Sequence, residues 1–293
     1  MKAAYPSATV NERFVTVGTR RIFLAESGTG PTVLMLHEGS PGASGLSNYS
    51  RNIGMLAARY RVLVPDLPGY GQSSKGIDVR DPFGDLAASM LAMLRAIRIS
   101  RAHVVGNSFG GACALRMAIE SPETIGRLVL MGADGVNTSR ALPTMALRRS
   151  IGYYKGRGPS REKLATLLRR DFVDDASSVT EDLVDERFRA SLGPEVLAKP
   201  SLRRLRGITN FRHIDFTRDP RVRAVENPTL VLWGMEDKVN RVSGAKALAT
   251  RLPNCDVHLY GKTGHWVQWE RAEEVNAAVA SFLAQDVSVG TVE

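Results

Sequence analysis

The segment 102–112, AHVVGNSFGGA, constrains the fold of this chain more than any other stretch. The apolar pair Val104–Val105 predicts a buried strand, and the residues from 111 to about 119 predict a helix. Between them lies GNSFG (106–110), in which a glycine stands two residues to either side of Ser108. This pattern is typical of a turn so tight that side chains at the glycine positions would clash. The segment therefore predicts a nucleophile elbow with Ser108 at its tip.

Apolar strand-like runs alternate with helical patterns over most of the chain. The first two runs predict a hairpin, and the full set of predicted strands besides the elbow strand is Phe14–Val17, Arg21–Ala25, Thr32–Leu36, Arg61–Pro65, Arg127–Met131, Thr229–Trp233 and Asp256–Tyr260. Helices are predicted near 86–97, 242–251 and 275–282 from the spacing of their apolar residues. The alternation predicts an α/β fold with a mostly parallel central sheet, helices on both faces, and ligands beyond the carboxyl ends of the strands.

Residues 139–218 have a different character. Strand-like runs disappear there, and short helical patterns occur among many arginines. The segment Ser178–Glu181 has the S-x-x-E form of a capping box and predicts the start of a helix. We therefore predict a helical lid at 139–218, inserted between two parts of a core domain at 1–138 and 219–293. Such a lid would keep bulk water from the serine and shape a pocket.

Composition limits the class of protein. With 293 residues and 43% hydrophobic content, the chain can bury one large core with an insertion, or two cores. No run approaches the ~20 apolar residues of a membrane span, the N-terminal residues lack the pattern of an export signal, and Cys113 and Cys255 match no metal spacing. We expect a cytoplasmic protein that binds no membrane and no metal.

The net charge of +9 raises the question of nucleic-acid binding. The basic residues are interleaved with acidic ones, and no basic-aromatic repeat accompanies them. We therefore expect no nucleic-acid partner. An anionic small substrate fits the positive excess equally well.

A serine hydroxyl needs a base to remove its proton. The best candidate among the five histidines is His265, because it lies in a glycine-containing loop after a late strand. The others have plainer interpretations: His103 and His258 fall inside strands, His213 falls in the lid, and His37 adjoins a loop that it is expected to hold in shape. We predict that His265 is the base.

A carboxylate must hold the imidazole in one tautomer and stabilise its cation. Asp237 follows the strand TLVLWG in a turn, so its side chain can face the same sheet edge; Asp134 is the alternative, although a structural turn role suits it better. The resulting order, Ser108, Asp237, His265, is that of the α/β-hydrolase fold. Serine at the elbow also argues against dehalogenases and epoxide hydrolases of this fold, which carry aspartate there.

The loop 37–42, HEGSPG, directly follows the strand Thr32–Leu36. A glycine-rich loop in this place can direct a backbone N–H at a developing oxyanion, although an ordinary turn would have a similar composition. From the residues alone, both interpretations remain open.

Four segments together resemble one family, the meta-cleavage product hydrolases. They are HEGSPGASGLSNYSRNIG (37–54), GNSFGGACAL (106–115), WGMEDKVN (233–240) and GHWVQWE (264–270). The resemblance runs from the first strands to the last helix. It implies an α/β-hydrolase that breaks a carbon–carbon bond in ring-opened aromatic compounds, without a metal or organic cofactor, and as a dimer or larger homo-oligomer.

The resemblance also implies roles for individual residues. The backbone N–H groups of Gly39 and Phe109 would form the oxyanion hole, and the second also follows from the elbow geometry. Asn107, Asn48 and Trp266 would line the site, with core packing as the alternative for Trp266. In the lid, Arg187 would hold the substrate's carboxylate and Phe172 would form an aromatic wall.

Helical spacing supports an inward-facing Arg187 separately, because it lies four residues after Leu183 and three after Val184. A structural ion pair with a lid aspartate is the alternative. One residue departs from the family: Glu38 stands where glycine is usual. A carboxylate there would oppose negative charge developing at the oxyanion site unless it points away, which puts the role of Gly39 and the substrate range in question.

We therefore expect hydrolysis of an anionic 2-hydroxy-6-oxohexa-2,4-dienoate-type substrate to a 2-hydroxydienoate and a carboxylic acid. An ordinary carboxylesterase of the same fold is the first alternative. A ligand receptor that retains the triad but turns over slowly is the second. The sequence does not indicate the substituent on the distal ketone, which the lid would determine.

Overall fold

The computed structural model describes residues 9–136, 142–201 and 211–285. The predicted start of the lid at 139 lies outside the described residues, and the proposed domain limits stay a prediction. Within the described ranges, no helix is long and apolar enough to cross a membrane.

A single eight-stranded sheet forms the centre of the described structure, in the order β1-β2-β4-β3-β5-β6-β7-β8. Its strands are β1 (Asn11–Val17), β2 (Arg20–Ser27), β3 (Thr32–Leu36), β4 (Arg61–Pro65), β5 (Ala102–Asn107), β6 (Ile125–Met131), β7 (Thr229–Gly234) and β8 (Cys255–Tyr260). β2 pairs antiparallel with β1 and β4, and all pairs from β4 through β8 are parallel. The predicted mostly parallel sheet is confirmed.

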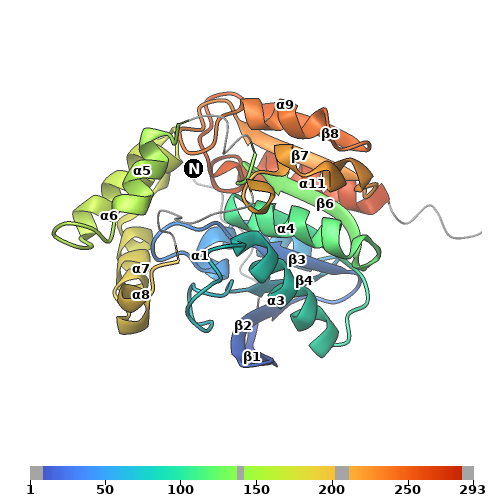
Figure 1. Cartoon of the computed structure of the whole chain (residues 1–293), viewed down its shortest axis with the longest axis horizontal. Helices are drawn as coiled ribbons and strands as arrows, with labels where there is room; N and C mark the ends of the chain where they lie inside the picture. Colours follow the sequence, from blue (N-terminus) through green and yellow to red (C-terminus); the bar gives the residue numbers. More distant parts are fainter. Residues whose placement is uncertain (1–8, 137–141, 202–210, 286–293) are drawn as a thin grey trace, which may run out of the picture.

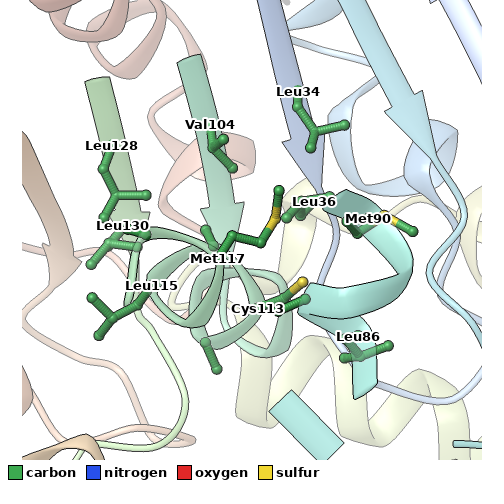
Figure 2. Close-up of a cluster of buried hydrophobic side chains, with 14 of the residues drawn as sticks. Leu34, Leu36, Leu86, Met90, Val104, Cys113, Leu115, Met117, Leu128 and Leu130 are labelled. Atoms are coloured by element: carbon green, nitrogen blue, oxygen red, sulfur yellow. The ribbon is translucent and has the colours of Figure 1, made fainter. Parts of the chain in front are cut away.

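Helices cover both faces of the sheet because the central strands are apolar on both sides. On one face, Leu34, Val104 and Leu128 pack with α3 (Pro82–Ala96), α4 (Phe109–Glu120) and α9 (Ser243–Ala249), as Figure 2 shows for the first two helices. On the other face, the alternate strand residues Val105 and Val129 pack with α1 (Gly45–Tyr49), α2 (Ile53–Ala57) and α11 (Ala272–Ala284). The alternation of side chains along each strand thus builds two cores.

Between β6 and β7, the described residues 142–201 form a group of short helices beside the sheet (Figure 1). The α-helices are α5 (Met145–Gly152), α6 (Arg161–Leu167), α7 (Glu181–Ser191) and α8 (Pro194–Ala198). A third apolar cluster joins residues of these helices, such as Leu164 and Val184, to Trp266 and Trp269 near the end of the chain. We refer to 142–201 as the lid helices; they pack directly over the loop that carries His265.

Two predicted helix starts differ in detail from the structure. A helix does start within the predicted segment Ser178–Glu181, but Ser178 is not its cap: Thr180 is the N-cap of α7, and its hydroxyl accepts the N–H of Leu183 at 3.3 Å. Ser178 instead ends a short 3-10 turn. The elbow helix α4 begins at Phe109, two residues before the predicted start at 111 and directly after the turn at Ser108.

Candidate active site

Ser108 occupies a strained turn between β5 and α4. Its backbone has φ 53° and ψ −113°, a positive φ that is unusual for a residue with a side chain. A Cβ on Gly106 would lie 2.4 Å from the carbonyl oxygen of Gly110, and one on Gly110 would lie 2.0 Å from that of Leu36. Only glycine fits at these two positions, so the turn holds Ser108 at the carboxyl end of β5, at the N-terminus of α4.

His265 and Asp237 form a buried pair. The imidazole Nδ1 lies 2.8 Å from Asp237 Oδ2, and both side chains are fully buried. The other carboxylate oxygen of Asp237 accepts the backbone N–H groups of Val239 and Asn240, each at 2.8 Å. A carboxylate can only accept, so Nδ1 carries the proton and Nε2 keeps its lone pair. Within the described residues, Nε2 has no hydrogen-bond partner, so its lone pair is available to accept a proton.

Charges around His265 favour its protonation. Burial acts to lower its pKa, but the charge of Asp237 and its hydrogen bond, helped by Asp134 and Glu38, outweigh burial and raise the pKa above the ordinary value. The imidazolium that forms when His265 accepts a proton is thereby stabilised. This is the electrostatic setting that a general base needs when it must hold a proton transiently.

Asp134, the alternative carboxylate, has a different partner. Its Oδ1 accepts the side-chain N–H of Asn240 at 2.7 Å, and burial raises its pKa. The backbone N–H of Asp134 donates to the carbonyl of Ser108 at 3.0 Å. Asp134 therefore supports the loops around the elbow, in keeping with the expected turn role.

His37 holds the loop after β3 in a fixed conformation. Its Nε2 accepts the N–H of Leu67 at 2.9 Å, so Nδ1 carries the proton and donates to the carbonyl of Glu38 at 2.6 Å. Burial lowers the pKa of His37 and keeps the ring neutral. In a trans peptide the N–H points opposite to the C=O, so this bond also fixes the direction of the Gly39 N–H.

Gly39 and Phe109 lie next to each other, as an oxyanion hole requires. A Cβ on Gly39 would be 3.0 Å from Phe109 Cβ and 3.0 Å from the hydroxyl of Tyr70. That hydroxyl donates to the Gly39 carbonyl at 3.0 Å. The backbone N–H groups of Gly39 and Phe109 have no hydrogen-bond partner in the described part of the chain, so both remain available to an anion.

Arg187 of α7 faces inward, but its partner is Glu38 and not a lid aspartate. Its Nη1 donates to Glu38 Oε1 at 2.5 Å and to Ser40 Oγ at 2.9 Å, and each side chain of the ion pair is 1% exposed. Burial opposes ionisation of Glu38, but the charge and hydrogen bonds of Arg187 and the bonds from Ser40 outweigh it and lower the pKa of Glu38. The carboxylate that departs from the family pattern is therefore ionised and turned toward Arg187.

Several buried donors near this pair have no partner within the described residues. They are Arg187 Nε, Arg187 Nη2, Asn48 Nδ2 and Trp266 Nε1. Arg187 also lies over the Trp266 ring, with Cζ 4.6 Å from its centroid. Buried donors are rarely left unpaired, so their concentration here indicates a site for an acceptor-rich ligand.

The position of Phe172 agrees with its expected role, whereas that of Asn107 does not. The Phe172 ring packs edge-on against His265 and Trp266, with centroids 5.4 and 5.3 Å apart, as an aromatic wall would. The expected substrate contact of Asn107 is not supported, because its Nδ2 donates to the carbonyls of Met131 (3.1 Å) and His265 (3.5 Å). Its Oδ1 accepts from Gln268 at 3.1 Å, so Asn107 ties the elbow to the His265 loop.

Sequence reasoning missed Ser40, Tyr70 and Gln268, which orient Glu38, Gly39 and Asn107, respectively. Ser40 lies within the segment already recognised, and its position beside Glu38 was the available signal. Nothing near Tyr70 or Gln268 in the sequence indicates which distant residue each contacts.

Comparison with known proteins agrees with this geometry. Residues 32–272 match the family described as α/β hydrolase fold. A 2-hydroxy-6-oxo-6-phenylhexa-2,4-dienoate hydrolase from Burkholderia cepacia is 34% identical over 287 residues, 95% of this chain and 98% of the relative. A 2-hydroxy-6-oxononadienedioate/2-hydroxy-6-oxononatrienedioate hydrolase from a Pseudomonas species is 36% identical over 271 residues, 90% of this chain and 92% of the relative.

The chain belongs to the meta-cleavage product hydrolases. Solved structures agree with this assignment. A meta-cleavage product hydrolase from Pseudomonas fluorescens, determined with acetates, is 29% identical with a TM-score of 0.83, over 94% of this chain and 98% of that chain. The 2-hydroxy-6-oxo-6-phenylhexa-2,4-dienoate hydrolase of a Rhodococcus strain is 25% identical with a TM-score of 0.85, over 94% and 99% of the two chains. The present chain is thus a serine-dependent hydrolase of the α/β-hydrolase fold.

Proposed function

We propose that this meta-cleavage product hydrolase cleaves the carbon–carbon bond next to the distal ketone of a 2-hydroxy-6-oxohexa-2,4-dienoate-type acid. The products are a 2-hydroxydienoate and a carboxylic acid. One observation carries the residue assignment: a buried His265–Asp237 pair leaves the imidazole Nε2 unpartnered at the sheet edge where the elbow presents Ser108. The relatives named above act on substrates of this type.

In the proposed reaction, the dienol first ketonises, which turns the departing carbon into a stabilised leaving group. His265 Nε2 then accepts the proton of Ser108 Oγ as that oxygen attacks the distal ketone. The resulting oxyanion accepts hydrogen bonds from the N–H groups of Gly39 and Phe109. Collapse of this intermediate breaks the C–C bond, and the carbon takes the proton from His265. Water, activated by the same imidazole, then releases the acid from Ser108.

The lid side of the site would bind the other end of the substrate. The Nε and Nη2 groups of Arg187 share the edge of the guanidinium that can donate two parallel hydrogen bonds to one carboxylate. Asn48 and Trp266 supply further unpartnered donors nearby. We therefore propose that the substrate's carboxylate binds at Arg187, and that a lid at about 139–218 keeps water from the distal ketone.

A coloured ring-fission product tests this function. The purified protein should bleach its visible absorbance, and Ser108→Ala should not. The esterase alternative predicts instead that p-nitrophenyl esters are turned over far faster than the dienoate and that Arg187→Ala leaves the rates unchanged. Bleaching by Ser108→Ala at the rate of the unchanged protein would contradict the mechanism.

We also propose, from the family resemblance, that the protein assembles as a dimer or larger homo-oligomer. Light scattering after size-exclusion chromatography tests this directly.

A cytoplasmic location is proposed in addition, because Cys113 and Cys255 are both free thiols, as in a reducing compartment.

A further inference from the structure

Glu38 is a buried charged residue close to the proposed site that the proposed mechanism does not use. It stands in the loop after β3, one residue before Gly39, and reaches across to Arg187 on α7. The ion pair therefore connects the loop of the proposed oxyanion hole to Arg187, the proposed carboxylate site. A fixed negative charge thus stands beside a site that is proposed to bind anions.

The contacts of Glu38 fix its carboxylate in place. Oε1 accepts from Ser40 Oγ at 2.7 Å and from Arg187 Nη1, and Oε2 accepts from the backbone N–H of Ser40. A Cβ on Gly42 would lie 1.9 Å from the carbonyl oxygen of Arg187, so the loop and α7 are in direct backbone contact here. With both side chains 1% exposed, the carboxylate can neither rotate into solvent nor be screened by it.

Glu38 occupies only one end of the guanidinium. Nη1 is bound, whereas Nε and Nη2 remain buried without a partner in the described residues. A carboxylate can therefore still form two hydrogen bonds with Arg187 while Glu38 stays in place. Two hydrogen-bond donors of Arg187 are therefore still available to an anion. The positive charge of Arg187, however, is already balanced by Glu38.

We propose that Glu38 determines the charge selectivity of the site: it is a built-in counter-ion that weakens the attraction of Arg187 for carboxylates. This inference rests on the proposed function for the role of Arg187. Two like charges on one guanidinium repel strongly in a buried setting. The site then recognises a carboxylate by its hydrogen-bonding shape more than by its charge, and the dienoate product leaves more readily.

Hexa-2,4-dienoate and its neutral amide are the probes, because they share one carbon skeleton and differ in charge. Calorimetry measures the affinity of each for the unchanged protein and for Glu38→Gln and Glu38→Gly. Removing the charge should strengthen binding of the dienoate by roughly tenfold and leave the amide within about twofold. Gln keeps the size of the side chain, and Gly restores the residue usual in the family, so a folding defect in one variant does not prevent the test.

Two further variants serve as controls. Arg187→Gln should weaken dienoate binding by about tenfold or more, which places the probe at this arginine. Glu181→Gln removes the same charge from the exposed start of the same helix, where Glu181 pairs with Arg161 and Arg169, and should change neither affinity.

The opposite result would overturn the inference. If Glu38 served to orient Arg187, both Glu38 variants would bind the dienoate more weakly than the unchanged protein does. Equal gains in affinity for the dienoate and the amide would also contradict a role for charge. Because binding is measured without turnover, these outcomes remain distinct from a failure of the proposed C–C hydrolysis, which only the bleaching assay detects.

Discussion

Ser108, Asp237 and His265 all follow strands of the core, whereas Arg187 and Phe172 belong to the lid helices. The core residues are placed by backbone geometry that tolerates little change. The lid is built differently, from short helices joined by ion pairs, and residues 139–218 carry 17 Lys or Arg against 10 Asp or Glu, a net +7 of the chain's +9. We infer a division of roles, in which the core performs the chemistry and Arg187 of the lid binds the carboxylate of the substrate.

The strongest test of this division removes the nucleophile. Ser108→Ala should lower kcat by at least about a thousandfold, because no other group would form the covalent bond. Binding of hexa-2,4-dienoate, which depends on the lid side, should be nearly unchanged. Steady-state kinetics and calorimetry on the same preparation measure both. A parallel loss of binding would show that the two functions are not separate.

Asp237→Asn tests whether the core pair sets the basicity of His265. We expect kcat to fall by about a thousandfold or more, because an amide favours the wrong imidazole tautomer. The pKa of His265 is raised largely by Asp237, so activity should be lost as the pH falls through that raised value. In the variant, the acidic limb of the kcat/KM profile should move to lower pH.

Asp134→Asn is the matched control for that experiment. Asp134 is partly buried and also raises the pKa of His265, but its carboxylate accepts a hydrogen bond from Asn240 and not from the ring. It should shift the acidic limb less than Asp237→Asn does, and lower kcat by less than tenfold. A larger effect from Asp134 would reverse the assignment of the two carboxylates.

A pair of glycine substitutions compares the packing of the two regions. Gly110→Ala should cost about 3 kcal/mol of unfolding free energy, because its Cβ would meet the Leu36 carbonyl oxygen at 2.0 Å. Gly152→Ala, at the end of lid helix α5, meets nothing within 4 Å and should change stability by less than about 0.5 kcal/mol. Denaturant unfolding measures both. Equal losses of unfolding free energy in the two variants would contradict the inference that the core is packed more tightly than the lid.

Arg187→Gln isolates the contribution of the lid to catalysis. We expect KM for the dienoate substrate to rise about tenfold to a hundredfold, since a charge-assisted bidentate contact is lost, while kcat changes only a few-fold. A methyl ester of the same substrate cannot accept two parallel hydrogen bonds and should show a much smaller rise in KM. A fall in kcat as large as that of Asp237→Asn would place Arg187 in the chemical step.

The same division explains what the sequence could predict. The elbow, the strands and the order Ser108, Asp237, His265 follow from short motifs whose residues act on their immediate neighbours, and the sheet and the His265–Asp237 contact match those expectations. The lid has no such motif. Helical spacing predicted that Arg187 faces inward. Its partner Glu38, however, is 149 residues away in the sequence, and no local motif predicts this ion pair.

Smaller differences have the same origin. Asn107 was expected to line the substrate site, yet its amide is hydrogen-bonded to the carbonyls of Met131 and His265 and to the side chain of Gln268. Thr180 and not Ser178 caps α7, because the preceding residues fold into a 3-10 turn. The bonds of Asn107 join segments far apart in the sequence, which no local motif predicts, and the cap of α7 depends on the conformation of the turn before it.

The central claim is that His265, oriented by Asp237, activates Ser108, and covalent labelling tests it most directly. The unchanged protein is incubated with a fluorophosphonate, and the modified residue is found by mass spectrometry. The account predicts one adduct, on the peptide that contains Ser108, which is lost in Ser108→Ala and forms at least about a hundredfold more slowly in His265→Ala. Labelling at another residue, or labelling of Ser108 at an unchanged rate without His265, would contradict it.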